Sequence, residues 1–282
     1  MEPTFKTGKV ILAGAGPGDP ELVTVKTIRY LQKAEIVLVD RLVSNEIISQ
    51  YVNAATEIID VGKQCRRGIS TSQETINHLM VQKALQGKLV VRLKGGDVSV
   101  FSNILDELEI LTKNNIPYEI IPGITAALGA AAFTGIPLTA RGYATAVRFL
   151  TYYRSDIIPA SYWKELAATD DTLVFYMSSE TVLQVVENLT ANNIDETKLL
   201  AIVEQATTPL QNVHISNLYD FKNAFSHSTF ISPSLVIIGK VVALHEKFKW
   251  LQNHESDEYY FEPLPSPVIS LNYPDKTHKN VS

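Results

Sequence analysis

The sequence predicts an α/β fold with two α/β domains, the first of them built around a parallel sheet. Three features of the 282-residue chain indicate this class. Apolar, β-branched runs end in glycine-aspartate turns at residues 14–19 and 95–97. Strand-like and helix-like segments alternate along the first half, as in parallel α/β proteins. A stretch without periodicity at 135–143 separates this half from a second, similar one.

The expected strands of the first half are short apolar runs bounded by turn residues. They cover residues 9–13, 36–40, 57–61, 88–93 and 118–121. The expected helices between them cover residues 21–33, 44–50, 72–86, 103–114 and 124–134. This alternation indicates a parallel sheet with helices on both faces. Ligands of open α/β sheets bind at the carboxyl ends of the strands, where both glycine-aspartate turns lie.

The second half repeats the alternation less regularly. Its expected strands cover residues 147–152, 172–177, 199–204, 211–215 and 234–239. Its expected helices cover residues 161–168, 180–191, 217–225 and 241–250. We therefore expect one domain over residues 8–138 and another over 143–250. Residues 252–282 are rich in Asn, Ser, Pro and Asp, a composition that predicts a disordered tail.

Composition limits the functional classes. The formal net charge of −5 argues against nucleic acid as a partner, although a local basic pocket stays possible. Cys65 is the only cysteine, so we expect no internal disulfide, no metal and a reducing compartment. The chain has neither a signal-peptide core at its first residues nor an apolar run of membrane-spanning length. These features predict a cytoplasmic protein with no membrane partner.

The first turn has a lookalike, the dinucleotide-binding pattern G-x-G-x-x-G. Asp19 stands where the last glycine would be, and Pro17 lacks the backbone N–H that a pyrophosphate would need. Asp40 ends the second strand, where a ribose-binding acid would lie in a nicotinamide enzyme. A nicotinamide site and a tight turn without a ligand therefore remain alternatives. Thr125 likewise has a purely structural interpretation, as the cap of the following helix.

Eight segments, in the same order, resemble the tetrapyrrole methylase superfamily and, within it, the uroporphyrinogen-III C-methyltransferases. The resemblance runs from about Gly8 to Trp250. The matching segments are residues 14–19, 40–44, 61–63, 90–97, 122–126, 135–139, 174–177 and 239–244.

The resemblance implies a mixed sheet in the second domain and S-adenosylmethionine in a cleft between two domains. It further implies methylation of uroporphyrinogen III at C2 and C7 to precorrin-2, by a homodimer. The implied cofactor contacts are Pro17, Gly95, Gly96, Asp97, Val100, Thr125, Ala126, Met177 and Ala206. The implied proton acceptor is Asp40, and the implied proton donor is Lys63.

The implied substrate carries eight carboxylates, so an acidic protein must gather cations locally, and arginine suits carboxylates best. We expect substrate contacts from Arg41, Arg66, Arg67 and Arg141. Further candidate cations are Arg92, Lys94 and Arg148.

One stretch departs from the family pattern. The usual G-D-P-F-V-F-G-R-G is G-D-V-S-V-F-S-N-I at residues 96–104, and the usual T-H-R is Thr139-Ala140-Arg141. Three interpretations follow: ordinary activity with a repositioned loop, a different tetrapyrrole or other acceptor, or a cofactor-binding protein that has lost activity. The retained Asp40, Lys63 and Arg141 favour the first.

Overall fold

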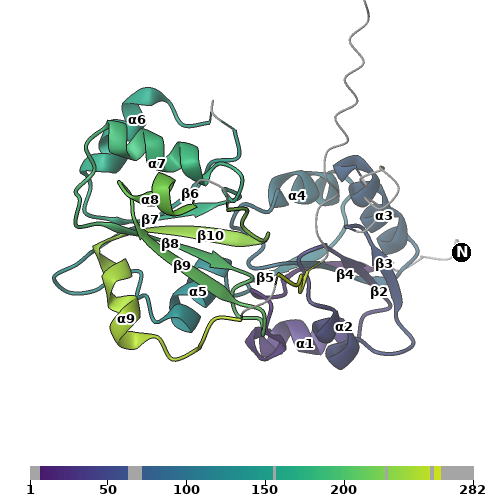
Figure 1. The fold of residues 1–282 in the computed structure, drawn as a ribbon. Coiled ribbons are helices and arrows are strands. Elements are labelled where there is room, and N and C mark those ends of the chain that lie inside the picture. Colours follow the sequence, from purple (N-terminus) through teal and green to yellow (C-terminus); the bar gives the residue numbers. More distant parts are fainter. Residues whose placement is uncertain (1–6, 63–71, 155–156, 226–227, 255–256, 262–282) are drawn as a thin grey trace, which may run out of the picture.

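The computed structural model describes residues 7–62, 72–154, 157–225, 228–254 and 257–261. Two lobes lie side by side, one formed by the first half of the chain and the other by the second (Figure 1). Each lobe contains one five-stranded sheet. The expected two-domain α/β fold is therefore confirmed.

The first sheet contains all five strands predicted for it. They are β1 (Lys9–Gly14), β2 (Ile36–Val39), β3 (Glu57–Asp60), β4 (Leu89–Lys94) and β5 (Tyr118–Ile121). Their order is β3-β2-β4-β1-β5, and every neighbouring pair is parallel. The strand β1, which lies between β4 and β5, is almost fully buried, as a parallel strand covered on both faces must be.

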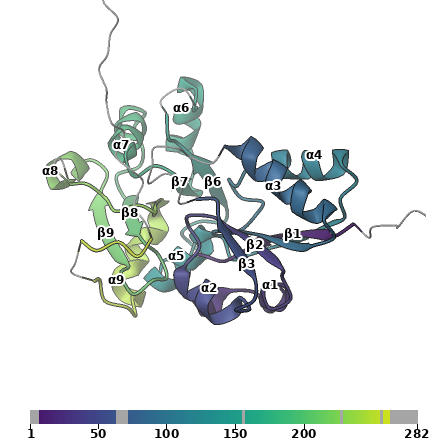
Figure 2. The same cartoon turned by 90° about the vertical axis from the view of Figure 1, so that its right-hand side faces the viewer.

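Helices cover both faces of this sheet. α1 (Val25–Leu31) and α2 (Asn45–Tyr51) lie on one face, and α3 (Gln73–Leu85) and α4 (Ile104–Lys113) on the other (Figure 2). Successive side chains of β1 lie on opposite faces of the sheet. Ile11 packs in the hydrophobic cluster beneath α1 and α2, whereas Leu12 packs in the cluster beneath α3 and α4.

The second sheet is mixed, as the family resemblance implied. It contains β6 (Val147–Thr151), β7 (Thr172–Tyr176), β8 (Leu199–Glu204), β9 (Asn212–Asn217) and β10 (Ser234–Gly239), in the order β6-β7-β10-β8-β9. Only the β6–β7 pair is parallel, and the other three pairs are antiparallel.

One face of the second sheet packs against α6 (Ala160–Ala168), α7 (Val182–Ala191) and α8 (Phe221–Phe225). The other face packs against α5 (Ala126–Thr134) and the 3₁₀ segment Lys240–Leu244, which leads into α9 (His245–Phe248) (Figure 1). Ala127 and Ala130 place α5 in the core of the second domain. The hydrophobic packing of the second domain thus begins with α5, whereas we expected the boundary between the two domains to follow this helix. Small alanine side chains let this helix lie close to the sheet.

Three helices differ from the sequence prediction. The expected helix at 21–33 is split into a 3₁₀ turn, Pro20–Leu22, and α1, because Thr24 caps α1 by accepting from Thr27 N at 3.2 Å. The segment at 217–225 narrows to α8, since β9 continues to Asn217. The segment at 241–250 is divided between the 3₁₀ segment Lys240–Leu244 and the four-residue helix α9.

Part of the expected disordered tail makes specific contacts. Asn253 exchanges two hydrogen bonds of 3.0 Å with the backbone of Val213. Residues 257–261, which we call the strap, include Phe261, whose side chain is 3% exposed. Residues 262–282 lie outside the described part of the chain.

Candidate functional site

Three loops meet at the carboxyl edge of the first sheet, because β1 lies between β4 and β5. The loops after β1 and β4 exchange two backbone hydrogen bonds, Gly16 N to Gly96 O at 3.1 Å and Gly96 N to Gly16 O at 2.7 Å. The loop after β5 joins them at Gly123. A Cβ added to Gly14 would lie 2.6 Å from both Gly96 O and Gly123 N, so only glycine fits between them.

Gly96 differs from the other glycines of these loops. A Cβ on Gly95 would lie 2.6 Å from Leu42 O, which explains that glycine by packing alone. At Gly96, with φ +67°, a Cβ would instead enter a space bounded by Ala126 N at 3.8 Å and Thr125 Cα at 4.0 Å. Gly96, Thr125 and Ala126, three of the predicted cofactor contacts, therefore border one space in which an added carbon would meet no atom closer than 3.8 Å.

Asp97 braces two of the loops. Its Oδ1 accepts from the backbone N of Ser99 at 2.8 Å and from the Ser99 hydroxyl, and its Oδ2 accepts from Gly123 N at 2.9 Å. The carboxylate is almost fully buried. Its first role is thus to fix the loops after β4 and β5 relative to each other.

The second domain reaches this edge through the end of β7. The hydroxyl of Tyr176 lies 2.7 Å from Thr125 Oγ1 and accepts from Ala127 N at 3.1 Å. The second bond gives a partner to one backbone N–H in the first turn of α5. Burial raises the pKa of Tyr176, so the phenol stays neutral. Thr125 stands at the N-cap position, but its side chain does not make the capping bond that we considered. Phe101 packs against the Tyr176 ring, with centroids 5.0 Å apart.

The turns that contain Pro17 and Ala206 come together from opposite domains. A Cβ on Gly129 of α5 would lie 2.7 Å from Pro17 Cγ and 2.9 Å from Thr207 Cγ2. Asp19 N donates to Thr207 Oγ1 at 3.3 Å. The turns at 16–19 and 205–208 thus form the second part of the domain junction.

Unusual backbone conformations gather at this junction. Among the described non-glycine residues with positive φ, three are asparagines, and the others are Phe101, Met177, Gln205 and Thr207. A positive φ is rare for such side chains, above all for a β-branched threonine. Residues held this way are concentrated at functional sites. Sequence reasoning did not detect them, since no glycine or asparagine marks these positions.

Asp40 is the exposed end of a buried charge network. Its Oδ2 lies 3.9 Å from Arg92 Nη2, and its Oδ1 accepts from Arg41 N at 3.0 Å. Glu107 of α4 has no exposed surface and pairs with Arg92 Nε at 3.1 Å and with Lys94 Nζ at 2.9 Å. Burial lowers the pKa of Lys94, and Glu107 opposes that decrease.

These pairs overturn part of the expected set of substrate cations. Arg92 and Lys94 are buried against Glu107, and Arg148 pairs with Asp171 at 2.6 Å and Glu165 at 2.5 Å. Arg141 is exposed in the turn that follows α5. Lys63, Arg66 and Arg67 lie outside the described residues.

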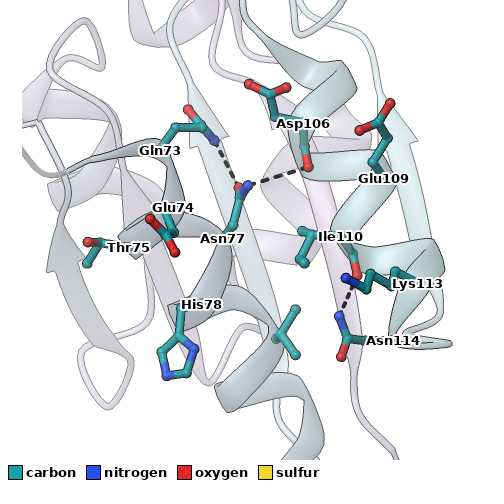
Figure 3. Close-up of a pocket in the computed structure, with 11 residues that line it drawn as sticks. Gln73, Glu74, Thr75, Asn77, His78, Asp106, Glu109, Ile110, Lys113 and Asn114 are labelled. Carbon is teal, nitrogen blue, oxygen red and sulfur yellow. Dashed lines mark hydrogen bonds between the residues drawn. The ribbon is translucent and has the colours of Figure 1, made fainter.

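A separate open pocket of about 860 Å³ lies between α3 and α4 (Figure 3). Hydrogen bonds within its lining link Gln73 to Asn77 at 2.9 Å and Asn77 to the carbonyl of Asp106 at 3.4 Å. None of the predicted site residues lines it. Within the described ranges, no group of His, Cys, Asp or Glu is arranged to hold a metal ion, and no helix could span a membrane.

A sequence model described as tetrapyrrole (corrin/porphyrin) methylases matches residues 9–222. The chain belongs to this family. It is 41% identical over 245 residues to a siroheme synthase of Vesicomyosocius okutanii and 42% identical to one of Ectopseudomonas mendocina. These matches cover 87% of the chain but 52% and 53% of the relatives, so the chain spans about half the length of these curated relatives.

Solved structures agree with this family. A uroporphyrin-III C-methyltransferase of Thermus thermophilus, complexed with S-adenosylhomocysteine, is 32% identical with a TM-score of 0.71, covering 84% of this chain and all of that one. A cobalt precorrin-4 methyltransferase is 25% identical with a TM-score of 0.74, covering 83% and 95%. The bound product in the Thermus structure agrees with the cofactor expected from the sequence.

Proposed function

We propose that the chain is an S-adenosylmethionine-dependent C-methyltransferase that converts uroporphyrinogen III to precorrin-2 by methylation at C2 and C7. The observation that carries this proposal is the space beside Gly96, Thr125 and Ala126, at the junction of two domains of a tetrapyrrole methylase. The similarity to siroheme synthases and to the Thermus enzyme supports the choice of substrate.

The proposed cofactor contacts fit a donor with an adenosine end and a methionine end. Gly96 leaves its backbone open to the space, and Met177 offers an apolar, polarizable surface that is 51% exposed. When bound, S-adenosylmethionine supplies a methyl group on a sulfonium. The remaining proposed contacts are Pro17, Gly95, Asp97, Val100, Thr125, Ala126 and Ala206.

The protein's part in the reaction is to align the donor with a ring carbon and to manage charge. The new carbon–carbon bond forms as the sulfur–methyl bond breaks, and that bond's electron pair stays on sulfur. The macrocycle gains a positive charge and then loses a proton. Asp40 lies at the carboxyl end of β2 and is partly exposed, which suits the acceptor of that proton. We assign substrate carboxylates to Arg41, Arg66, Arg67 and Arg141, and proton donation to Lys63.

Incubating the purified chain with uroporphyrinogen III and S-adenosylmethionine tests the reaction. We expect S-adenosylhomocysteine and a red-shifted product; the absence of both contradicts the proposal. In Asp40→Ala, affinity for S-adenosylhomocysteine should change less than about twofold while methylation slows by roughly 10²-fold or more. Equal loss of binding and rate would mean that Asp40 serves the cofactor instead.

A second candidate is a cofactor-binding homologue that acts on another tetrapyrrole or on none. It rests on the loop at residues 98–103. Lys94 Nζ donates a hydrogen bond to the backbone carbonyl of Ser102, and the Ser102 hydroxyl donates one to the carbonyl of Val98. This loop lacks the family's arginine, because Asn103 stands there. Calorimetry separates the two candidates, since binding of S-adenosylhomocysteine without turnover of any tetrapyrrole supports the second.

We also propose a homodimer in the cytoplasm, with no nucleic acid or membrane as partner. Family resemblance supports the dimer, and the negative net charge argues against nucleic acid. Sedimentation of the purified chain would test the dimer directly.

A further inference from the structure

We propose that Tyr260 and Phe261 of the strap are positioning residues for the cofactor site, because Tyr260 joins Ser44 of the first domain to the turn at 205–208 of the second, and Phe261 packs between that turn and the turn at 16–19. This inference rests on the proposed function, since those two turns carry Pro17 and Ala206.

Tyr260 is bonded to both domains at once. Its hydroxyl lies 2.8 Å from the hydroxyl of Ser44, which caps α2 in the first domain. Its backbone N donates to Gln205 Oε1 at 2.7 Å, and Gln205 Nε2 donates to Glu258 O at 3.0 Å. Gln205 follows β8 of the second domain, so the strap joins the two domains through a single tyrosine and its neighbours.

Phe261 fills the space between the two turns. A Cβ added to Gly18 would lie 3.3 Å from Phe261 Cζ, 3.3 Å from Thr207 Oγ1 and 2.9 Å from Thr208 Cγ2. The aromatic ring therefore shares the surroundings of Gly18 with side chains of the other domain. Its almost complete burial shows that this is a packed contact and not a surface contact.

Apart from Ser44, the strap contacts lie beside proposed cofactor contacts in the sequence. Gly18 follows Pro17, and Gln205 and Thr207 flank Ala206. Both flanking residues have positive φ, so this turn needs support from its surroundings to keep its shape. Removing the strap contacts should let the two halves of the cofactor site move apart, because positioning depends on the packing behind the contacts.

The experiment uses the full chain and two pairs of matched variants. Tyr260→Phe and Phe261→Ala are compared with Tyr259→Phe and Tyr259→Ala, because Tyr259 is the preceding residue and is 54% exposed. The measurements are the Kd for S-adenosylhomocysteine by calorimetry and the split between KM and kcat. We expect the Kd and the KM for S-adenosylmethionine to rise about tenfold in the strap variants, a typical coupling between sites. The kcat of the strap variants at saturating cofactor should stay near the wild-type value. The Kd and the KM of the Tyr259 variants should also stay near wild type.

The outcomes separate this proposal from the proposed function. A wild-type chain that binds no S-adenosylhomocysteine contradicts both. If the wild-type chain binds S-adenosylhomocysteine and the Tyr260→Phe and Phe261→Ala variants bind it equally tightly, the strap proposal alone is contradicted. Tyr260→Phe removes one oxygen atom and keeps the ring, so it tests the strap even where Phe261→Ala does not fold. Phe261→Leu refills the space and should restore most of the affinity.

Discussion

Glu107 is a buried acidic side chain that pairs with two buried basic side chains. Its carboxylate has no exposed surface, and its two oxygens pair with Arg92 and Lys94. Together with Asp40 these groups balance to zero formal charge. Without Glu107, two buried cations would face a single, partly exposed carboxylate. Removing one member of a buried ion pair is costly because the remaining charge is left without compensation.

Glu107→Gln should therefore lower the free energy of unfolding by about 3–5 kcal/mol, the range for a broken buried pair. Chemical denaturation measures the change. Glu109→Gln, on the exposed surface of the same helix, is the matched control, and its effect should stay within about 0.5 kcal/mol. Equal effects of the two substitutions would mean that the buried network contributes no net stability.

The sequence predicts some of these residues and misses others for a physical reason. Asp40 follows an apolar strand, and such a place at the carboxyl end of a sheet is readable from the sequence. Glu107 lies in a segment with Asp106 and Glu109, so the local pattern suggests a solvated helix face. Its burial depends on Arg92 and Lys94, which point to it from β4. Sequence reasoning assigned those two cations to a substrate because their internal partner was not recognisable.

At the level of elements, α5 depends on a side chain from another part of the chain. Tyr176 of β7 supplies the oxygen that accepts from Ala127 N in the first turn of α5. Tyr176→Phe should leave that N–H without a partner and lower the free energy of unfolding by about 1–3 kcal/mol. Thermal and chemical unfolding measure the loss. Tyr153→Phe, an exposed tyrosine after β6, should have little effect, and a similar loss in both variants would refute this role.

The edge strand β5 is tied to its neighbours by Glu119. Its carboxylate bonds Lys26 at 2.5 Å, Lys9 at 2.6 Å and the hydroxyl of Tyr30 at 2.6 Å, linking β5 to α1 and β1. These bonds, first that of Lys26, lower the pKa of Glu119 from 4.5 to about 2. A depressed pKa in the folded state means that the stabilisation is present above pH 4.5 and is lost as the pH falls towards 2.

Glu119→Gln should thus lower stability at pH 7 by no more than about 1 kcal/mol, since solvent screens these partly exposed pairs. The difference from wild type should disappear between pH 4.5 and about pH 2. Urea denaturation at several pH values checks this. A difference that is constant over this range would show that charge is not the cause.

The strands were easier to predict than the helices. All ten expected strands are present, because most of them are short apolar runs between turn residues. The helix predicted at 21–33 is broken by the 3₁₀ turn at Pro20–Leu22 and a cap at Thr24, and both are compatible with a continuous apolar pattern. Periodicity reports which face is buried, whereas the first residue of a helix depends on local hydrogen bonds.

On the scale of the whole molecule, the hydrophobic clusters of the two domains do not divide the chain where its composition changes. The turn-rich segment at 135–143 follows α5, yet α5 already packs in a hydrophobic cluster of the second domain. The sequence pattern cannot reveal this, because an alanine-rich helix can pack against either sheet. The strap was missed for a related reason, since its aromatic residues stand in a polar segment and are buried only by partners from both domains.

The packing of α5 in the second domain predicts how fragments of the chain behave. Residues 1–138 expressed alone should expose the face of α5 that contains Ala127 and Ala130, together with Ile136 and Leu138. Residues 1–124 lack that apolar surface. The longer fragment should therefore bind a hydrophobic dye more strongly and aggregate more readily than the shorter one. Equal dye binding by the two fragments would argue that α5 packs within the first domain.

The position of β1 between β4 and β5 has a consequence for the order of folding. Lys9 pairs with Leu89, and Val10 pairs with Tyr118, so the first strand to leave the ribosome waits for two of the last strands of its domain. Such long-range pairing is slow to form and leaves apolar edges open meanwhile. The second sheet waits in the same way for β10, which lies between β7 and β8. Tyr260 and Phe261 follow both sheets in the sequence, so their contacts with the two domains form only after β10 has been synthesised.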